Sequence, residues 1–256
     1  YFTARLRVHP EAGQPPIGAR RPSLPEVAAG APVERSYRTE LGDDGWTAPR
    51  PVIFPGLDEA QVVRVAWVAQ DETTCLVTVQ EPGELPWVGQ ATRAASSSPW
   101  GAVERMSVLG EGYAADAVFL KGSTTKIAFV TRMPGASQSD LTLLDPASGD
   151  APLPLAPNIN TPGDEWNPRV GPQNELFFCR SDRQLVLAGG AVLPMRLPGP
   201  HRTVFTQAAP TGDGSWVFFC SPTFTAVELD QDIYVAEWRG DGELGEAIPV
   251  DEWRPE

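Results

Sequence analysis

Acidic residues recur at the start of short apolar segments in this sequence, and carboxylates in such an arrangement can do two kinds of chemistry. If the segments converge, a ring of carboxylates would suit a hard cation such as Ca²⁺, which takes about six to eight oxygen ligands. Two carboxylates held about 5 to 9.5 Å apart could instead hydrolyse a glycosidic bond. The candidate catalytic residues for this second reaction are Asp58, Asp116, Asp164 and Asp251.

Two of these aspartates begin an Asp-Glu-Trp triplet, which occurs at residues 164–166 and again at residues 251–253. Because the triplet recurs with a repeat, a simpler interpretation is that its acids bond to backbone amides and its tryptophans pack between sheets. We favour this structural interpretation, and we keep Glu165 and Glu252 as candidate binding residues.

Imidazole chemistry is restricted to two histidines, His9 and His201. The sequence has no Gly-x-Ser-x-Gly elbow, which disfavours a hydrolase triad, and two imidazoles are too few for a histidine-based transition-metal site. His201 and Arg202 stand where the other repeats have acids. Since a position that breaks a repeat is a good candidate for function, both are predicted binding residues.

The segment GDGELG (residues 240–245) formally matches the Gly-x-Gly-x-x-Gly signature of dinucleotide sites. That signature works because a helix follows it and the amides of this helix meet the pyrophosphate. Here a strand-like segment follows, and two acids lie where the phosphates would be. The segment therefore predicts a hairpin turn and no nucleotide cofactor.

A repeat of short strands must position these residues. Self-similarity at periods of about 40 to 50 residues is typical of β-propellers, in which each blade is one supersecondary unit. Polar turns rich in Gly, Asn and Asp separate the strands, as hairpins require, and no helical pattern of any length is present. Aligned on one apolar position, five strands lie 75, 52, 49 and 41 residues apart, at Phe2, Val77, Phe129, Phe178 and Phe219.

The first spacing is long because a Pro-, Gly- and Ala-rich insertion of 24 residues occupies positions 9–32. A loop of this length is usually either functional or disordered. Its basic part contains Arg20 and Arg21, which we predict to contact a binding partner, with a disordered insertion as the equal alternative.

The two ends of the sequence read as parts of one repeat. DEWRPE (residues 251–256) nearly repeats DEWNPR (residues 164–169) but lacks the strand that should follow, whereas the chain opens on such a strand. We therefore predict one all-β domain, a five-bladed β-propeller of four-stranded antiparallel blades, closed by the C-terminal segment as the inner strand of the first blade. A pair of β-sandwiches and an open solenoid are the alternatives. The expected blades are residues 1–57 with 251–256, 58–110, 111–157, 158–200 and 201–250.

Composition excludes several classes of partner. The net charge is −13 and the isoelectric point is about 4.6, whereas a nucleic-acid-binding protein normally has a basic patch. No apolar run approaches the roughly 18 residues of a membrane helix, so no membrane insertion is expected. The three cysteines form no Cys-x-x-Cys pair, which disfavours a zinc knuckle or a redox motif. Cations, neutral glycans and basic protein surfaces are the partners that remain.

Three segments resemble the WD-like propeller repeats of the TolB family of bacterial envelope proteins. Residues 159–183 resemble the family's Asp-Glu-Trp-x-Pro unit with its following turn and strand, and residues 85–110 and 230–250 resemble the other half of the repeat. The turn GPQNE (residues 171–175) departs from the family's usual Pro-Asp-Gly. The resemblance implies a periplasmic or extracellular propeller with a non-enzymatic role, and a cytoplasmic location is the alternative.

Two functions follow as hypotheses. The first is a non-catalytic binding or scaffold β-propeller, without a cofactor, that recognises a protein or a glycan through one face of its ring. The second is a glycoside hydrolase that uses carboxylates at the mouth of the central channel. A scaffold stabilised by Ca²⁺ in that channel is a third hypothesis.

Overall fold

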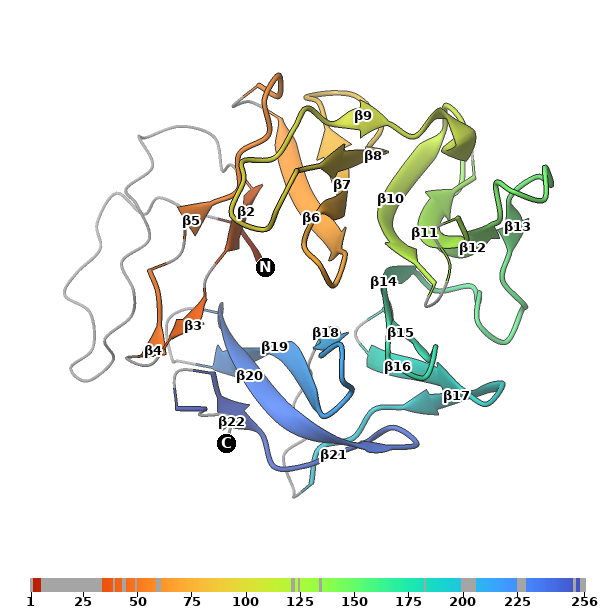
Figure 1. The fold of residues 1–256 in the computed structure, drawn as a ribbon. Coiled ribbons are helices and arrows are strands. Elements are labelled where there is room, and N and C mark those ends of the chain that lie inside the picture. Colours follow the sequence, from red (N-terminus) through yellow and green to blue (C-terminus); the bar gives the residue numbers. More distant parts are fainter. Residues whose placement is uncertain are drawn as a thin grey trace. The chain divides into compact units, whose positions relative to one another are not determined.

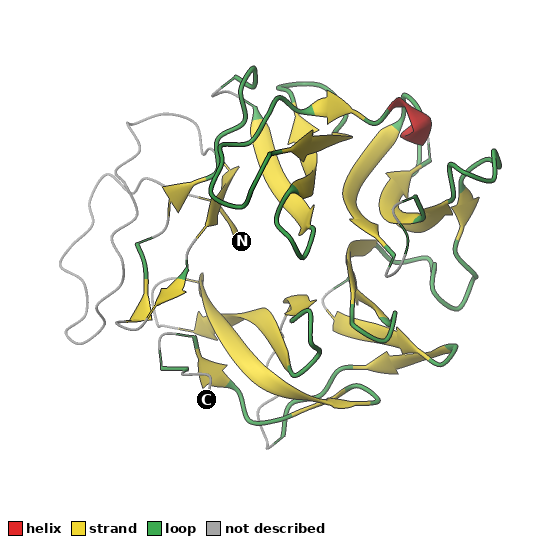
Figure 2. Ribbon diagram, viewed as in Figure 1, coloured by secondary structure: helices red, strands yellow, loops and turns green. Residues whose placement is uncertain are grey.

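The computed structural model describes residues 2–5, 34–38, 40–42, 45–48, 50–58, 61–120, 123, 125–133, 135–181, 183–198, 206–224, 229–250 and 252–253. The described elements are strands, apart from one 3₁₀ turn, η1 (Ser107–Leu109) (Figure 2). The chain divides into two compact units, Tyr1–Arg105 and Met106–Glu256. The predicted all-β class is confirmed.

The first unit contains one large sheet. Its strands follow the order β1-β2-β6-β7-β8-β9, and β5 also pairs with β2 (Figure 1). A separate two-stranded ribbon is formed by β3 and β4. The bounds are β1 (Phe2–Arg5), β2 (Glu34–Arg38), β3 (Leu41–Gly42), β4 (Gly45–Trp46), β5 (Arg50–Pro51), β6 (Val62–Val68), β7 (Thr74–Gln80), β8 (Trp87–Thr92) and β9 (Glu104–Arg105).

The second unit contains three antiparallel sheets in chain order. Two have four strands each, and in the third β21 and β22 both pair with β20. The bounds are β10 (Tyr113–Phe119), β11 (Ile127–Arg132), β12 (Asp140–Leu144), β13 (Leu153–Pro154), β14 (Glu165–Val170), β15 (Leu176–Arg180), β16 (Arg183–Ala188), β17 (Ala191–Pro194), β18 (Thr206–Pro210), β19 (Trp216–Phe224), β20 (Leu229–Gly240), β21 (Glu243–Leu244) and β22 (Ile248–Pro249).

The prediction of five separate blades is wrong for the described part of the chain, which forms four sheets of four or more strands. Among the described strands, β2 pairs with β1 and β5 and also, in parallel, with β6, where Arg35 lies opposite Val63. The hydroxyl of Ser36 strengthens this junction by accepting a hydrogen bond from the Val65 amide at 2.7 Å. An open strand edge has unpaired amides and carbonyls, so it joins the nearest available sheet.

The predicted closing strand, residues 251–256, lies mostly outside the described residues. Of these six, Glu252 and Trp253 are described, and they lie in a turn after β22. The Trp253 ring packs edge-on against Trp216 and Phe218 of β19, with ring centroids 5.6 and 5.4 Å apart. Closure of a ring by this segment stays a prediction.

In three of the sheets the second hairpin strand, β7, β11 or β15, has a continuous run of residues buried on both faces. In β7, Cys75 to Val79 are all buried, and in β15, Leu176 to Cys179 are all buried. Sheets covered on both sides have continuous apolar strands rather than alternating ones. One core therefore lies between the two C-terminal sheets, where Phe177 and Val186 pack against Val217 and Phe219.

A β-bulge interrupts the first strand of each hairpin-linked set, β6, β10, β14 and β18. In the second unit the bulges place Asp116, Asn167 and Gln207 at φ values of 49°, 54° and 58°. Bulges re-aim side chains and are common beside functional sites. Strand β14 lies against β10 and β18, so these three bulges occur on neighbouring strands. In the described part of the chain, no helix is both long enough and apolar enough to cross a membrane.

Candidate functional site

Asp164 links two neighbouring sheets. Its Oδ1 atom accepts hydrogen bonds from the Ser139 amide at 2.8 Å and from the Ser139 hydroxyl at 2.9 Å, and its carbonyl accepts from the Ser181 amide. Ser139 directly precedes β12, whereas Asp164 directly precedes β14. The carboxylate thus satisfies a backbone donor at a strand end, which is a structural task.

Glu165 is fully buried and bonded within the protein. Its carboxylate accepts from the Thr161 hydroxyl at 2.7 Å and from the Arg180 Nε atom at 2.9 Å. Arg180 also donates to the carbonyls of Ile159 and Asn158. A buried charge needs partners of this kind. Glu165, predicted as a binding residue, is therefore placed as an internal support with none of its surface open to a ligand.

The other predicted acids have different surroundings. Asp116 is half-buried in the bulge of β10, Asp58 is exposed in a loop of the first unit, and Glu252 is exposed in the turn after β22. The Asp58 amide donates to the Gln61 side chain at 2.7 Å. The remaining predicted site residues lie outside the described residues, and their roles stay predictions: Asp251, His201, Arg202, Arg20 and Arg21.

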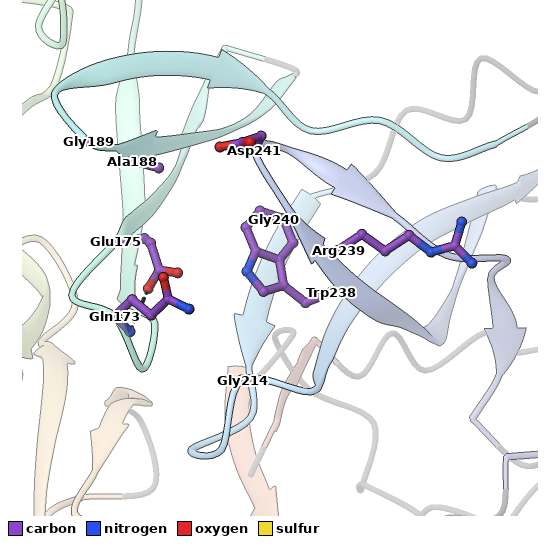
Figure 3. Close-up of a pocket in the computed structure, with 9 residues that line it drawn as sticks. All are labelled: Gln173, Glu175, Ala188, Gly189, Gly214, Trp238, Arg239, Gly240 and Asp241. Atoms are coloured by element: carbon purple, nitrogen blue, oxygen red, sulfur yellow. Dashed lines mark hydrogen bonds between the residues drawn. The ribbon is translucent and has the colours of Figure 1, made fainter.

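A groove between the two C-terminal sheets is a candidate site in the described part of the second unit (Figure 3). Its volume is about 420 Å³. Turns from both sheets surround it, so backbone and polar side chains dominate its walls. The lining residues are Gln173, Glu175, Ala188, Gly189, Gly214, Trp238, Arg239, Gly240 and Asp241.

Two glycines allow the turns to approach closely enough to form the walls. A Cβ atom on Gly214 would overlap the ring of Pro172, and a Cβ atom on Gly242 would lie 2.6 Å from the Pro194 carbonyl oxygen. Both glycines have positive φ, 77° and 84°. The hairpin at Gly242 is also bonded to the segment after β17, since Arg196 donates to the Gly242 carbonyl at 2.8 Å. These contacts fix both walls in place.

The groove presents an aromatic ring opposite a carboxylate. The Trp238 ring faces Glu175 and Gln173 across the groove, and Asp241 lies beside it (Figure 3). The other side of the tryptophan packs against Phe177, with ring centroids 5.2 Å apart. Arg239 extends away from the groove, and its Nε atom donates to Glu237 at 3.2 Å. A partly buried indole with polar neighbours is typical of a binding surface.

Sequence reasoning missed this groove, although the signals were present. Its two sides are built from GPQNE, the turn that departs from the repeat, and from GDGELG. The hairpin prediction for GDGELG is confirmed, because Gly240 pairs with Glu243 around the turn residues Asp241 and Gly242. The sequence does not show that the two turns belong to sheets that lie side by side.

Metal ligation has no obvious place in the described part of the chain. Among those residues, no three His, Cys, Asp or Glu side chains converge as a metal site would require. The groove contains two carboxylates, Glu175 and Asp241, and Ca²⁺ normally takes about six to eight oxygen ligands. Its aromatic and amide groups suit an organic ligand better.

Comparison with solved structures identifies the class of fold. The chain is similar to the protein assigned as TolB in Agrobacterium tumefaciens, with a TM-score of 0.53 and 13% identity over 86% of this chain and 76% of that one. TolB from Acinetobacter baumannii gives a TM-score of 0.48 and 12% identity, over 78% of this chain and 46% of that one. The first of these similarities shows a TolB-like β-propeller fold with antiparallel four-stranded sheets, as the sequence resemblance predicted.

A third similar structure is described as Bacteroides ovatus Xyloglucan PUL GH43B, with a TM-score of 0.43 and 15% identity, over 77% of this chain and 45% of that one. No protein-family model matches the sequence, and neither does any curated protein. The comparisons therefore establish the fold, and function has to be argued from the site.

Proposed function

We propose that this protein is a non-catalytic binding β-propeller that recognises a protein partner through the face of its second unit that contains the groove. The observation that carries the proposal is a half-buried tryptophan, Trp238, opposite a carboxylate between two fixed turns. Interfaces are enriched in such aromatic anchors, and rigid walls reduce the entropy lost on binding.

The surroundings of the predicted catalytic acid Asp164 favour a binding role for the protein over a hydrolytic one. Asp164 and its neighbour Glu165 already accept hydrogen bonds from Ser139, Thr161 and Arg180. A glycosidase needs two carboxylates that face the substrate, one of which donates a proton. The hydrolase hypothesis is tested by polysaccharide turnover with Asp58, Asp116, Asp164 and Asp251 each changed to Asn. Activity that any one of these changes abolishes would favour it.

The proposed location is periplasmic or extracellular, and a cytoplasmic location is the alternative. The support is the TolB-like fold, since the sequence resemblance is to envelope proteins. A fusion to a reporter that is active only outside the cytoplasm distinguishes the two locations. Calcium in the central channel also stays a proposal, and a melting temperature unchanged by a chelator would count against it.

The binding proposal is tested with a substitution that obstructs the groove. Gln173 is exposed at the groove wall, so Gln173→Arg adds a long cationic side chain there without disturbing the core. We expect this variant to lose the partner in a pull-down, whereas Gln138→Arg retains it. Gln138 is also exposed, in a loop outside the groove, and the substitution is chemically identical. Equal capture by both variants would contradict the proposal.

The insertion at residues 9–32 is a second proposed contact for the same partner. Its Arg20 and Arg21 lie outside the described residues, so only binding data can assess them. Deletion of residues 9–32 tests the insertion independently of the groove. Capture of a glycan rather than a protein, sensitive to Gln173→Arg, would keep the groove as the site and change the class of partner.

A further inference from the structure

The groove carries an excess of negative charge. Glu175 and Asp241 line it, and Arg239, the cationic side chain among its lining residues, is turned away and paired with Glu237. The second unit as a whole is acidic, because residues 106–256 carry 20 Asp and Glu against 10 Lys and Arg. The groove therefore complements a cation, and the surrounding field would attract one from solution.

Of the two acids in the groove, Glu175 is the better placed to bind a cationic ligand. It is 8% exposed, and its Oε2 atom accepts one hydrogen bond, from the Gln173 amide at 2.8 Å. No hydrogen bond from a described residue reaches its Oε1 atom, and the carboxylate points across the groove towards Trp238 (Figure 3). A carboxylate this buried is costly to desolvate with so few donors. A cationic donor from a ligand would offset that cost.

Trp238 supplies the second half of the site. Its ring is fixed from behind by Phe177 and from the backbone by a bond from its own amide to the Ser215 carbonyl at 2.9 Å. The ring lies opposite the Glu175 carboxylate (Figure 3). A cation between the two would meet a carboxylate on one side and the indole on the other.

We propose that the groove binds an arginine side chain of the protein partner, with the guanidinium bonded to Glu175 and packed against Trp238. This inference rests on the proposed function, because it names the chemistry that the partner must present. A guanidinium is planar, donates two parallel hydrogen bonds to one carboxylate, and stacks on an indole. An ammonium is more strongly hydrated and lacks the plane that matches the ring, so lysine should bind more weakly.

Short peptides test the chemistry directly. The ¹⁵N-labelled full chain is titrated with acetyl-Gly-Arg-Gly-amide, and the indole N–H resonance of Trp238, assigned by its loss in Trp238→Phe, is followed by NMR. We expect a saturable shift that weakens with added salt. The lysine peptide should bind more weakly, and the citrulline peptide, which has the same shape without the charge, should cause no shift.

Two variants connect the shift to the groove. Glu175→Gln keeps the shape and removes the charge, so the affinity for the arginine peptide should fall by about tenfold or more. Glu246→Gln removes an exposed carboxylate that does not line the groove and should change nothing. If Glu175→Gln fails to fold, the exposed Asp241→Asn gives the same comparison with a smaller expected loss, because Asp241 lies at the rim.

The outcomes separate this inference from the proposed function. Equal binding of the arginine and citrulline peptides, equal binding of the arginine and lysine peptides, or binding that Glu175→Gln leaves intact would each overturn the arginine site. If the peptides fail while Gln173→Arg still abolishes capture of the partner, the proposed function stands and the arginine site does not. If the peptides bind as expected but capture is unaffected by Gln173→Arg, the groove binds arginine and the protein partner uses another surface.

Discussion

At the scale of single residues, the same motif position has two different roles in this protein. Glu165 and Glu252 each follow an aspartate and precede a tryptophan. Glu165 is fully buried with Thr161 and Arg180, whereas Glu252 is exposed in a turn. Because burial decides what a carboxylate contributes, the shared sequence does not imply a shared contribution to stability.

This contrast predicts unequal effects of one substitution. Glu165→Gln should lower the free energy of unfolding by about 2 to 4 kcal/mol, because it removes the charge that compensates Arg180 in a buried pair. Glu252→Gln should change it by less than about 0.5 kcal/mol, as expected for an exposed site. Urea unfolding followed by circular dichroism measures both. Equal losses would show that Glu165 does not act through its buried bonds.

The three thiols are protected by burial. Burial raises the pKa of Cys75 and of Cys179 to about 12, and it raises the pKa of Cys220 to about 11. Since the thiolate is the reactive form, native thiols should react slowly with iodoacetamide at pH 8 and rapidly in urea. Cys220, which is half-buried with the smallest shift, should be alkylated first. Mass spectrometry of timed samples gives the order.

The raised pKa values also predict loss of stability in alkali. The unfolded chain releases its thiol protons near pH 9, before the native protein does, so the stabilisation is complete below pH 9 and is lost as pH rises towards 11 to 12. Each protected thiol should add about 1.4 kcal/mol per pH unit to this decline. Between pH 9.5 and 10.5, the free energy of unfolding of Cys179→Ala should fall less steeply than that of the parent chain. An identical slope would contradict the assignment.

At the scale of elements, the bulge explains a proline inside a strand. Pro168 lies in β14, where a regular ladder would need its missing N–H. The bulge puts Asn167 and Pro168 together opposite Phe178, because Trp166 pairs with Cys179 and Arg169 pairs with Phe177. Proline is tolerated at such a position. The Asp-Glu-Trp-x-Pro pattern is therefore the sequence of a bulged strand.

The left-handed conformation of Asn167 predicts the relative stabilities of two variants at this position. Asn167 has φ of 54°, and its buried Nδ2 atom has no hydrogen-bond partner among the described residues. Asn167→Gly should be at least as stable as the parent, because glycine removes both the backbone strain and the unpaired donor. Asn167→Val should lose about 1 to 2 kcal/mol, since a β-branched residue disfavours this region.

Thermal melting of the two Asn167 variants measures the order. Gln207, at φ of 58° in the bulge of β18, provides an independent repetition of the comparison. If the valine variant were the more stable one at both positions, the bulges would not impose the left-handed conformation on the folded chain.

At the scale of the whole molecule, packing between neighbouring sheets holds the second unit together. Gln184 illustrates this, because its buried Oε1 atom accepts from the Ala208 amide of the next sheet at 3.0 Å and from Cys179 of its own sheet at 3.1 Å. Phe177 and Phe219 meet in the same interior. Each sheet therefore depends on its neighbour, as expected for a propeller.

The burial of Trp253 predicts that the C-terminal end of the chain contributes strongly to the stability of the fold. Trp253 is 8% exposed and packs on Trp216 and Phe218, so Trp253→Ala should cost about 3 to 5 kcal/mol. Its repeat equivalent, Trp166, is only half-buried, so Trp166→Ala should cost clearly less. Denaturant unfolding measures the difference, and a larger loss at Trp166 would contradict it.

A truncation tests the predicted closure separately from this packing. A chain that ends at Trp253 keeps the aromatic contacts and loses residues 254–256, which the predicted closing strand requires. If the strand closes the ring, this chain should melt at a lower temperature than the full chain. An unchanged melting temperature would mean that Trp253 alone anchors the C-terminus.

The sequence by itself determined the period of the repeat, the all-β class, the TolB-like propeller fold and the hairpin at GDGELG. The repeat period, the strands and the hairpin are local properties, because turn residues and apolar strand patterns act over a few neighbouring positions. Only the tertiary structure decided that the N-terminal strands join the sheet of β6, that Glu165 is internal, and that Gln173, in a turn, and Trp238, 65 residues later in β20, line one groove. Burial and the pairing of strand edges depend on which sheets lie side by side, and no spacing within the sequence records that.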